Sequence, residues 1–407
     1  MKLFFIFIFL SFAFYSSAQR CATVEYSKLH NSGRAFTSPY ERPFSGRDTL
    51  SNEVIVIPVV VHVLFNTDEQ NISDQQVLSQ IDALNKDYRR MNADAANTPA
   101  PFRAVAADTR IVFCLAKTDP NGKATTGIIR KYTKATSFKT DDQMKFSSKD
   151  GDDAWDASTY LNLWVCNLSG NTLGYAVLPG SPAERDGVAI KYNAFGTTGL
   201  LKSPYNKGRT ATHEIGHWLG LRHLWGDEDC GDDGIADTPP QETSNNYCPS
   251  FPHTSSCSVN AEGDMFMDVM DFTDDACMNM FTEAQKSEMR GQFAKGNPRN
   301  SFLNSVACES PEPQAGPVVN PPDSLSSPSI STYPNPFNNE VTITSKHATD
   351  IVGQTLKLYD ATGKLVFTQI IQSQKTTLHL NTLPPGLYLL RIGSGDKLFV
   401  YKLMKYL

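Results

Sequence analysis

Three of the eight histidines in this 407-residue chain fall within eleven residues, and their spacing strongly constrains the local fold. His213 and His217 are four residues apart, so on a helix both side chains project from one face. Gly220 can end that helix in a conformation with positive φ, and the following turn can return His223 to the same point. Three converging imidazoles can hold one zinc ion and leave a fourth position open, which is typical of a catalytic site.

Glu214 directly follows the first of these histidines and would lie beside the ion. A carboxylate there can accept a proton from a zinc-polarised water and pass it to a departing amine. This chemistry cleaves amide bonds, so the pattern predicts a metallopeptidase. The alternative is a weak or inactive surface binding protein with a structural zinc. Glu214 argues against that alternative because a structural site needs no such carboxylate.

The first eighteen residues have the pattern of a secretory signal peptide. Lys2 precedes an almost wholly apolar run over residues 3–15, and Ser16–Ala18 supplies small residues for cleavage. A membrane anchor is the alternative, but the apolar run is shorter than the roughly 20 residues of a spanning helix. We therefore expect a secreted or cell-surface protein with no transmembrane segment in its mature form.

The remaining chain divides into four parts by composition. Residues 19–47 are polar and lack a clear period, so we interpret them as a pro-segment. Residues 48–308, the expected catalytic domain, combine β-branched runs with helical periodicity and predict a mixed α/β domain with one main sheet. Residues 309–331 hold six prolines and six serines, which is typical of an extended linker. Residues 332–407 carry short strand patterns and predict a small all-β sandwich, so the expected fold class is α+β.

One helix and several strands can be placed within the catalytic domain. The helix should begin after Ser73, a suitable N-cap. Its apolar face is expected to carry Val77, Leu78, Ile81, Leu84 and Tyr88. The strand-like segments are 54–65, 111–116, 161–166, 174–178 and 187–190.

Acidic residues are concentrated downstream of the histidines. The whole chain has 37 Lys plus Arg and 43 Asp plus Glu, a net charge of −6, so nucleic acid is not an expected partner. Between Arg222 and Lys286 there are fourteen carboxylates and no Lys or Arg. They could bind calcium, attract a basic substrate side chain, or form a solvated acidic loop.

Eight cysteines in an exported chain favour disulfides. Cys230, Cys248, Cys257 and Cys277 lie within one segment. Four cysteines allow three pairings, and their spacing does not choose among them.

The motif at 213–223 resembles that of the metzincin clan. The residues after it resemble the pappalysin family of secreted metalloendopeptidases, in the segments Leu224–Asp227, Asp232–Pro239 and Val269–Asn279. The similarity extends over about Asp48–Cys308. It implies a sheet-bearing upper half and a smaller lower half, with the active-site cleft between them. Substrate would lie along an edge strand near Gly174–Leu178.

The resemblance also implies roles for particular residues. Met270 would be the Met-turn residue beneath the zinc, and the disulfides would be Cys230–Cys257 and Cys248–Cys277. Bacterial relatives bind structural calcium and prefer to cut before Arg or Lys. Asp274 and Asp275 are then the nearest candidates to read that basic side chain. Phe272 stands where family members often have Tyr, so one transition-state hydrogen bond is expected to be absent.

Arg20–Ala22 resembles the pro-segment cysteine of related zymogens. A Cys21 thiolate could fill the open zinc position until the pro-segment is removed. The alternative is a disulfide from Cys21 to Cys308 or to another cysteine. Gly46–Arg47 is a candidate self-cleavage point.

The C-terminal part resembles the sorting domain of type IX secretion in Bacteroidetes. The resemblance is carried by Tyr333–Phe337, Leu358–Lys364 and Gly386–Arg391. It implies export across the outer membrane, with the type IX machinery as a partner beside protein substrates. An ordinary carbohydrate- or protein-binding sandwich is the alternative.

Overall fold

The computed structural model describes residues 20–30, 53–258, 261–310, 330–335, 337–345, 351–360, 364–393 and 399–405. The chain forms two compact units with a boundary between Gln314 and Ala315. The predicted signal peptide, the candidate cleavage point Gly46–Arg47 and most of the predicted linker lie outside the described residues. Within the described ranges, no helix is long and apolar enough to cross a membrane.

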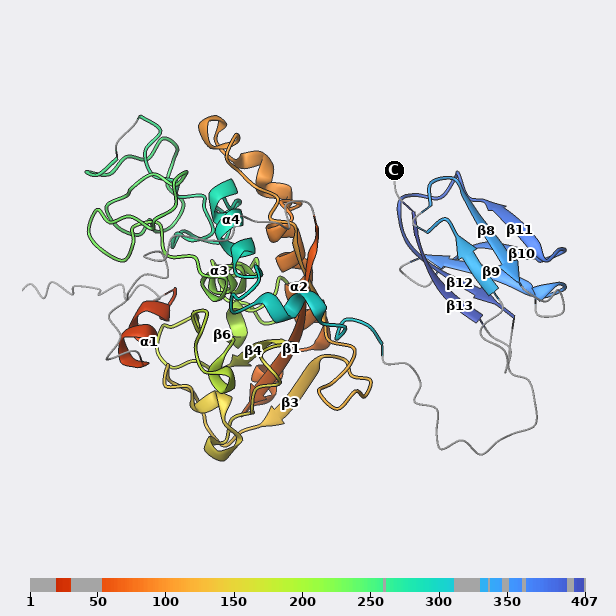
Figure 1. Ribbon diagram of the computed structural model, residues 1–407, viewed down its shortest axis with the longest axis horizontal. Coiled ribbons are helices and arrows are strands. Elements are labelled where there is room, and N and C mark those ends of the chain that lie inside the picture. The colour runs from red at the N-terminus through yellow and green to blue at the C-terminus, as the bar shows by residue number, and fades with distance from the viewer. Residues whose placement is uncertain are drawn as a thin grey trace, which may run out of the picture. The chain divides into compact units, whose positions relative to one another are not determined.

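A mixed sheet forms the centre of the first unit (Figure 1). Its strands are β1 (Ile55–Phe65), β2 (Ile111–Leu115), β3 (Ile128–Tyr132), β4 (Leu161–Cys166), β5 (Gly174–Ala176) and β6 (Val188–Lys191). The order is β2-β1-β4-β6-β5, and β3 also pairs with β1. All pairs are parallel except β5 with β6, and β5 stands last in the order. The expected edge strand is therefore β5.

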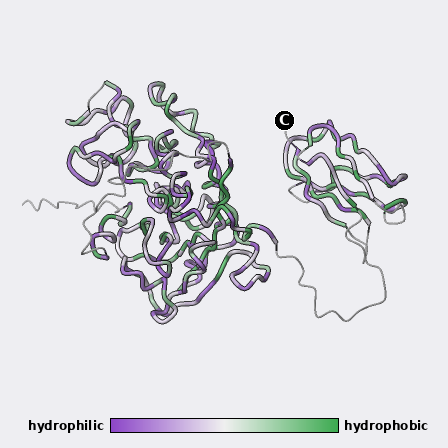
Figure 2. Tube along the Cα trace, in the orientation of Figure 1, coloured by the Kyte–Doolittle hydropathy of each residue, from purple (hydrophilic) through white to green (hydrophobic). Residues whose placement is uncertain are grey.

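The central strand β1 is buried because its β-branched residues pack on both faces of the sheet. Val59, Val61 and Val63 belong to the main core, whereas Val60 packs into a small cluster on the other face. Figure 2 shows hydrophobic residues gathered along these strands. The helices of this unit are α1 (Thr23–His30), α2 (Asp74–Tyr88), α3 (Arg209–Trp218) and α4 (Glu283–Gly291). Helices α2 and α3 contact each other and supply residues to the main core.

Helix α2 begins where the sequence predicts, but its buried apolar face is narrower than the predicted one. The Ser73 hydroxyl accepts a hydrogen bond from Gln76 N at 3.2 Å. The other four residues predicted for the apolar face, Val77, Ile81, Leu84 and Tyr88, are buried. The prediction is wrong for Leu78, because this side chain is 49% exposed. At about 100° per residue, Leu78 lies about 100° around the helix from Val77, while the other three lie within about 40° of it.

The second unit consists of two antiparallel sheets. One has the order β10-β9-β12-β13 and the other β11-β8-β7. The strands are β7 (Ile330–Tyr333), β8 (Glu340–Ser345), β9 (Thr355–Asp360), β10 (Leu365–Ile370), β11 (Lys375–His379), β12 (Gly386–Ile392) and β13 (Phe399–Lys405). Buried residues of both sheets, such as Ile343 and Leu390, share one core. The predicted fold class, including the small β-sandwich, is confirmed.

The core of the first unit can be tested within α2. Leu84 is fully buried and Leu78 is half exposed, so the same substitution samples both environments. We predict that Leu84→Ala lowers the free energy of unfolding by about 2–5 kcal/mol. Leu78→Ala should change it by less than about 0.5 kcal/mol. Denaturant unfolding followed by tryptophan fluorescence measures both values, and equal losses would contradict the assigned helix face.

Candidate metal centre

Helix α3 carries His213, Glu214 and His217, and its C-terminal end turns the chain toward His223. Leu221 N donates to Gly216 O at 3.0 Å, and Gly220 N donates to His217 O at 2.9 Å. This pair of hydrogen bonds is a Schellman motif, which needs a left-handed residue. Gly220 supplies it with a φ of +96°. The turn expected at Gly220 is therefore present.

The three imidazoles converge at one point. Nε2 of His217 lies 3.1 Å from Nε2 of both His213 and His223, and the latter two atoms are 3.3 Å apart. Each Nδ1 faces an acceptor. That of His213 faces Val269 O, that of His217 faces Leu221 O, and that of His223 faces the Asp227 carboxylate. The Nδ1 atoms therefore carry the protons, and three Nε2 lone pairs point at one another.

Two lone pairs cannot form a hydrogen bond with each other, so these three Nε2 atoms fit a bound cation. A tetrahedral zinc with Zn–N bonds of about 2.0–2.1 Å would hold its nitrogens about 3.3 Å apart. Burial also lowers the pKa of His213 well below its usual value and that of His217 to about 3, so both rings stay neutral. Burial would raise the pKa of Asp227, but its hydrogen bond and charge interaction with His223 lower it overall.

Met270 lies directly against helix α3. A Cβ on Gly216 would come within 2.5 Å of Met270 Sδ, so only glycine permits this approach. The neighbouring carbonyl of Val269 is the acceptor for His213 Nδ1 at 2.7 Å. The Phe272 ring lies 4.8 Å from the His223 ring in edge contact and 5.7 Å from that of His213. The segment around Met270 therefore supports the histidines by packing and by one hydrogen bond.

Glu214 faces the edge strand and is covered by the N-terminal segment. The Thr23 hydroxyl donates to Glu214 Oε2 at 2.9 Å, and Cys21 Sγ lies 3.3 Å from the same oxygen. Burial raises the pKa of Glu214 to about 8. The Cys21 sulfur and one nitrogen of each of the three histidines all lie within 4.8 Å of one another.

The N-terminal segment also pairs with the edge of the sheet. Ala22 N donates to Gly174 O at 3.0 Å, and Ala176 N donates to the Thr23 hydroxyl at 2.9 Å. Cys21 and Gly174 form a parallel bridge. A Cβ on Gly174 would meet Glu214 Cγ at 2.9 Å, so this end of β5 is in contact with the general-base candidate. Residues 21–23 thus lie against both β5 and α3, and we call the place that they fill the groove.

Arg20 is buried in a polar pocket beyond Cys21. Its Nη2 lies 2.9 Å from Asp275 Oδ1, and its Nη1 donates to Thr273 O at 2.7 Å. Its guanidinium also lies 5.4 Å from the centre of the Tyr205 ring. Of the two predicted specificity residues, Asp275 contacts Arg20, whereas Asp274 is partly exposed and shows only a charge interaction with it.

The acidic segment is held together by disulfides. Cys230 pairs with Cys257 and Cys248 with Cys277, the two pairings that the resemblance implies. Cys308 pairs with Cys114, which leaves Cys21 and Cys166 as buried free thiols in the described part of the chain. A Cys21–Cys308 bond is therefore not formed.

Two buried carboxylates of this segment have one oxygen each without a partner. Asp233 Oδ1 accepts from Ile235 N and the Thr238 hydroxyl, while its Oδ2 has no partner among the described residues. Asp268 Oδ1 accepts from Met270 N, while its buried Oδ2 is likewise unpaired within the described ranges. Burial raises the pKa of both, that of Asp233 to about 7, and nearby carboxylates add to the rise. These atoms could hold a cation.

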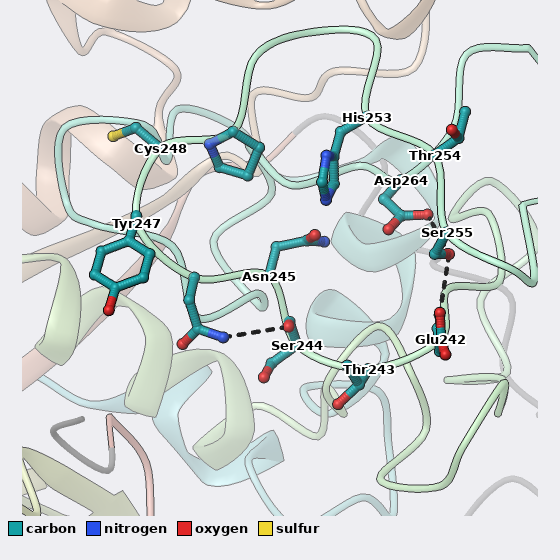
Figure 3. Close-up of a pocket in the computed structure, with 12 residues that line it drawn as sticks. Glu242, Thr243, Ser244, Asn245, Tyr247, Cys248, His253, Thr254, Ser255 and Asp264 are labelled. Atoms are coloured by element: carbon teal, nitrogen blue, oxygen red, sulfur yellow. Dashed lines mark hydrogen bonds between the residues drawn. The ribbon is translucent and has the colours of Figure 1, made fainter. Parts of the chain in front are cut away.

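An open pocket of about 500 Å³ lies within the same segment (Figure 3). It is lined by residues 242–249, 253–255 and Asp264, and none of the three histidines contributes to it. The backbone oxygen of Tyr247, one of these residues, accepts a hydrogen bond from Asp274 N at 2.8 Å. The pocket therefore borders the loop that carries the predicted specificity residues, and it is separate from the metal centre.

Sequence reasoning missed three contributors to this site. Asp227 lies inside the motif continuation, but its hydrogen bond to His223 Nδ1 was not anticipated. Thr23 and Arg20 lie within two residues of Cys21, and this closeness in the sequence could have indicated that they belong to the site. Their partners lie 191 to 255 residues away in the sequence, which no local pattern reveals.

The orientation of His223 provides a test of the metal centre. Residues that orient a metal ligand typically contribute a factor of about 10–100 in metal affinity. We predict that Asp227→Asn weakens zinc binding by about that factor, because Asn forms a weaker hydrogen bond to Nδ1–H. Competition with a zinc-selective chelator measures it. Asp229→Asn, at an exposed neighbouring position, is the control, and equal affinities would contradict the assigned role.

Comparison with known proteins agrees with this geometry. Residues 145–294 match the family model of pregnancy-associated plasma protein-A, and residues 331–406 match the secretion system C-terminal sorting domain. An extracellular metalloprotease of Arthroderma otae is 31% identical over 245 residues, covering 58% of this chain and 76% of that protein. A second, of Sordaria macrospora, is 36% identical over 140 residues, and the match spans about half of it (48%) and 33% of this chain.

Solved structures extend the similarity to about two thirds of the chain. Mature mirolysin of Tannerella forsythia, in complex with a cleaved peptide, is 50% identical, with a TM-score of 0.62. The match covers 64% of this chain and 99% of the mirolysin chain. A promirolysin variant from the same organism matches with the same identity and TM-score over 88% of its chain. With its sorting domain, this chain is a secreted or cell-surface protein. It belongs to the pappalysin family of metzincin metalloendopeptidases.

Proposed function

We propose that the chain is made as a latent precursor whose mature form uses zinc to hydrolyse extracellular proteins before Arg or Lys. The observation that carries this proposal is the convergence of His213, His217 and His223 beside Glu214, with residues 21–23 filling the groove. Zinc held by three imidazoles would acidify a bound water and polarise a substrate carbonyl. The structure of mirolysin, which is 50% identical in sequence over the matched region, contains a cleaved peptide. This supports a peptide substrate for the present chain.

The chain's own residues would supply the proton transfers. Release of residues 20–23 frees Glu214 Oε2 from Thr23 and Cys21. The carboxylate can then accept a proton from the attacking water and donate it to the departing amine. The backbone of β5, which pairs with Ala22 in the latent chain, would hold the substrate in an extended conformation. Phe272 has no hydroxyl and contributes only packing around the imidazoles.

Specificity for a basic residue follows from the partners of Arg20. A guanidinium already fits the pocket made by Asp275, Thr273 O and Tyr205. Asp275 is fully buried, and a buried carboxylate interacts strongly with a cation that it hydrogen-bonds. We infer that a substrate Arg or Lys takes the place of Arg20, with Asp275 as its main partner and Asp274 as a more distant charge.

Cleavage-site profiling of the activated full-length chain tests catalysis and specificity together. Against a mixed peptide library, cuts should fall before Arg or Lys. Glu214→Ala should lower kcat by about 10²–10⁴-fold, and a chelator should abolish cutting. Asp275→Asn should reduce kcat/KM for Arg substrates by about 10–100-fold relative to substrates with apolar residues.

Glu69→Ala, at an exposed position, is the control for this profile. One bound zinc with no cuts by the activated chain would favour the surface binding protein instead. Cuts without preference for Arg or Lys would remove only the specificity part of the proposal.

Latency is the second part of the proposal. Cys21 is a free thiol that shares one point with the three imidazoles, so its sulfur would be the fourth zinc ligand. Burial raises the pKa of Cys21, and a bound zinc would offset this because metals bind the thiolate. The same segment covers Glu214. Both the metal and the proton acceptor are then withheld from substrate until the segment is removed.

Cys21→Ala in the full-length chain tests latency. We predict at least roughly tenfold higher peptidase activity before any cleavage, because the fourth zinc position becomes open to water. Intact mass is checked by mass spectrometry in the same samples. Cys166→Ala, which removes the other free thiol, should leave the precursor as inactive as wild type. A Cys21→Ala precursor as inactive as wild type would refute the switch.

Calcium is the third part of the proposal. Asp233 and Asp268 each present one buried oxygen that has no partner among the described residues to an acidic environment, and such hard oxygens are typical calcium ligands. Asp268 is adjacent to Val269 and close to Met270, so a cation there would stabilise the segment that supports His213. The remaining ligands would be carbonyls, carboxylates or waters.

Add-back of calcium to the metal-depleted chain, reloaded with one equivalent of zinc, tests this site. We predict that calcium raises Tm by several degrees and that magnesium does not, since binding to the folded state alone stabilises it. Asp233→Asn should abolish most of this shift. The exposed neighbour Asp232→Asn should keep it. A calcium shift unchanged in Asp233→Asn would place the ion elsewhere.

A further inference from the structure

A buried charged pair beside β5 has no role in the chemistry described above. Asp142 and Lys145 are both fully buried, and Lys145 Nζ lies 2.9 Å from Asp142 Oδ1. Lys145 Nζ also donates to Arg185 O at 2.8 Å. Three aromatic rings, those of Tyr26, Trp164 and Tyr175, have their centres 5.0–5.4 Å from Nζ. The lysine is therefore fixed, and so is the Asp142 oxygen that it contacts.

The second oxygen of this carboxylate is used by the N-terminal segment. The Tyr26 hydroxyl donates to Asp142 Oδ2 at 2.5 Å, while the Tyr175 hydroxyl donates to Oδ1 at 2.9 Å. The Tyr26 and Tyr175 rings pack with centroids 5.0 Å apart. Arg185 Nη1 lies 3.7 Å from the same oxygen. Tyr26 thus fills a place that offers an aromatic wall and a buried acceptor.

This place adjoins the substrate groove. Tyr175 lies between Gly174, which contacts Glu214, and Ala176, which belongs to the main core. Side chains alternate along a strand, and Tyr175 packs instead with Tyr26 and Trp164 on the other face. A peptide paired with β5 would also alternate its side chains. Those that point away from α3 would reach the Tyr175 side.

The charges select the chemistry of the occupant. Asp142 is already neutralised by Lys145 and approached by Arg185, so a cationic side chain would be repelled by two positive charges. A phenol is a neutral donor and brings a ring for the aromatic wall. Phenylalanine has the ring but would leave the buried Oδ2 without a donor, which is unfavourable.

We propose that Asp142, Lys145 and Tyr175 form an exosite for a tyrosine side chain. It is filled by Tyr26 in the latent chain and is open to tyrosine-containing peptides once the N-terminal segment has left. The proposal rests on the proposed function for removal of that segment, but the binding itself needs no catalysis.

Peptide binding to the full-length chain, freed of its N-terminal segment by added trypsin, tests the exosite. The Glu214→Ala background prevents cleavage of the probe, a labelled peptide of residues 20–30. Fluorescence anisotropy compares this peptide with its Tyr26→Phe version. We expect the Phe peptide to bind roughly tenfold more weakly, as for loss of a hydrogen bond to a charged acceptor. With Asp142→Asn the two peptides should bind equally.

Asp141→Asn, at the exposed neighbouring position, should keep the tenfold difference. Because the Asp142→Asn substitution would leave Lys145 unpaired, the double substitution Asp142→Asn/Lys145→Met repeats the comparison without a buried charge. Equal binding of both peptides to the chain that retains Asp142 overturns the exosite, and so does a difference that persists in both Asp142 variants. Failure of the proposed peptidase activity would leave these binding results unchanged, so the two proposals fail separately.

Discussion

Three imidazole lone pairs directed at one point are the constraint on which the catalytic unit depends. Without a cation they repel one another, and the Nε2 separations of 3.1–3.3 Å persist only if the rings are held. One of the holding groups, the carbonyl of Val269 beside Met270, lies 56 residues from its histidine, whereas the carbonyl of Leu221 and the Asp227 carboxylate lie four residues from theirs. Each acceptor fixes a tautomer as well as a position. The fold therefore places both the ligands and the groups that orient them.

In the proposed function, the N-terminal segment accounts for both latency and substrate recognition. Residues 20–26 make contacts with four parts of the first unit: Cys21 with the histidines, Thr23 with Glu214 and β5, Arg20 with Asp275 and Tyr26 with Asp142. A peptide substrate on β5 would meet the same groups. Under the proposed function, these contacts therefore indicate which substrate side chains the vacated site would bind.

Local patterns in the sequence predicted much of this structure. The zinc motif, the N-cap at Ser73 and the long buried run of β1 each depend on neighbours within a few residues, and each is present. Leu78 was assigned to the wrong face because one apolar residue about 100° around the helix from Val77 does not disturb the helical periodicity of the other apolar residues. β3 was missed because Ile128–Tyr132 is short and half exposed, with two basic residues that weaken its alternation. Cys114–Cys308 joins residues 194 apart, and no spacing rule selects such a pair.

Zinc K-edge absorption on the full-length chain, before and after removal of the N-terminal segment, tests the central claim most directly. We expect one zinc per chain, with three nitrogen ligands at about 2.0–2.1 Å and one sulfur at about 2.3 Å in the latent form. After activation the sulfur should be replaced by oxygen while the three nitrogens remain. A latent spectrum without sulfur would refute Cys21 as the fourth ligand, and fewer than three nitrogens would contradict the metal centre itself.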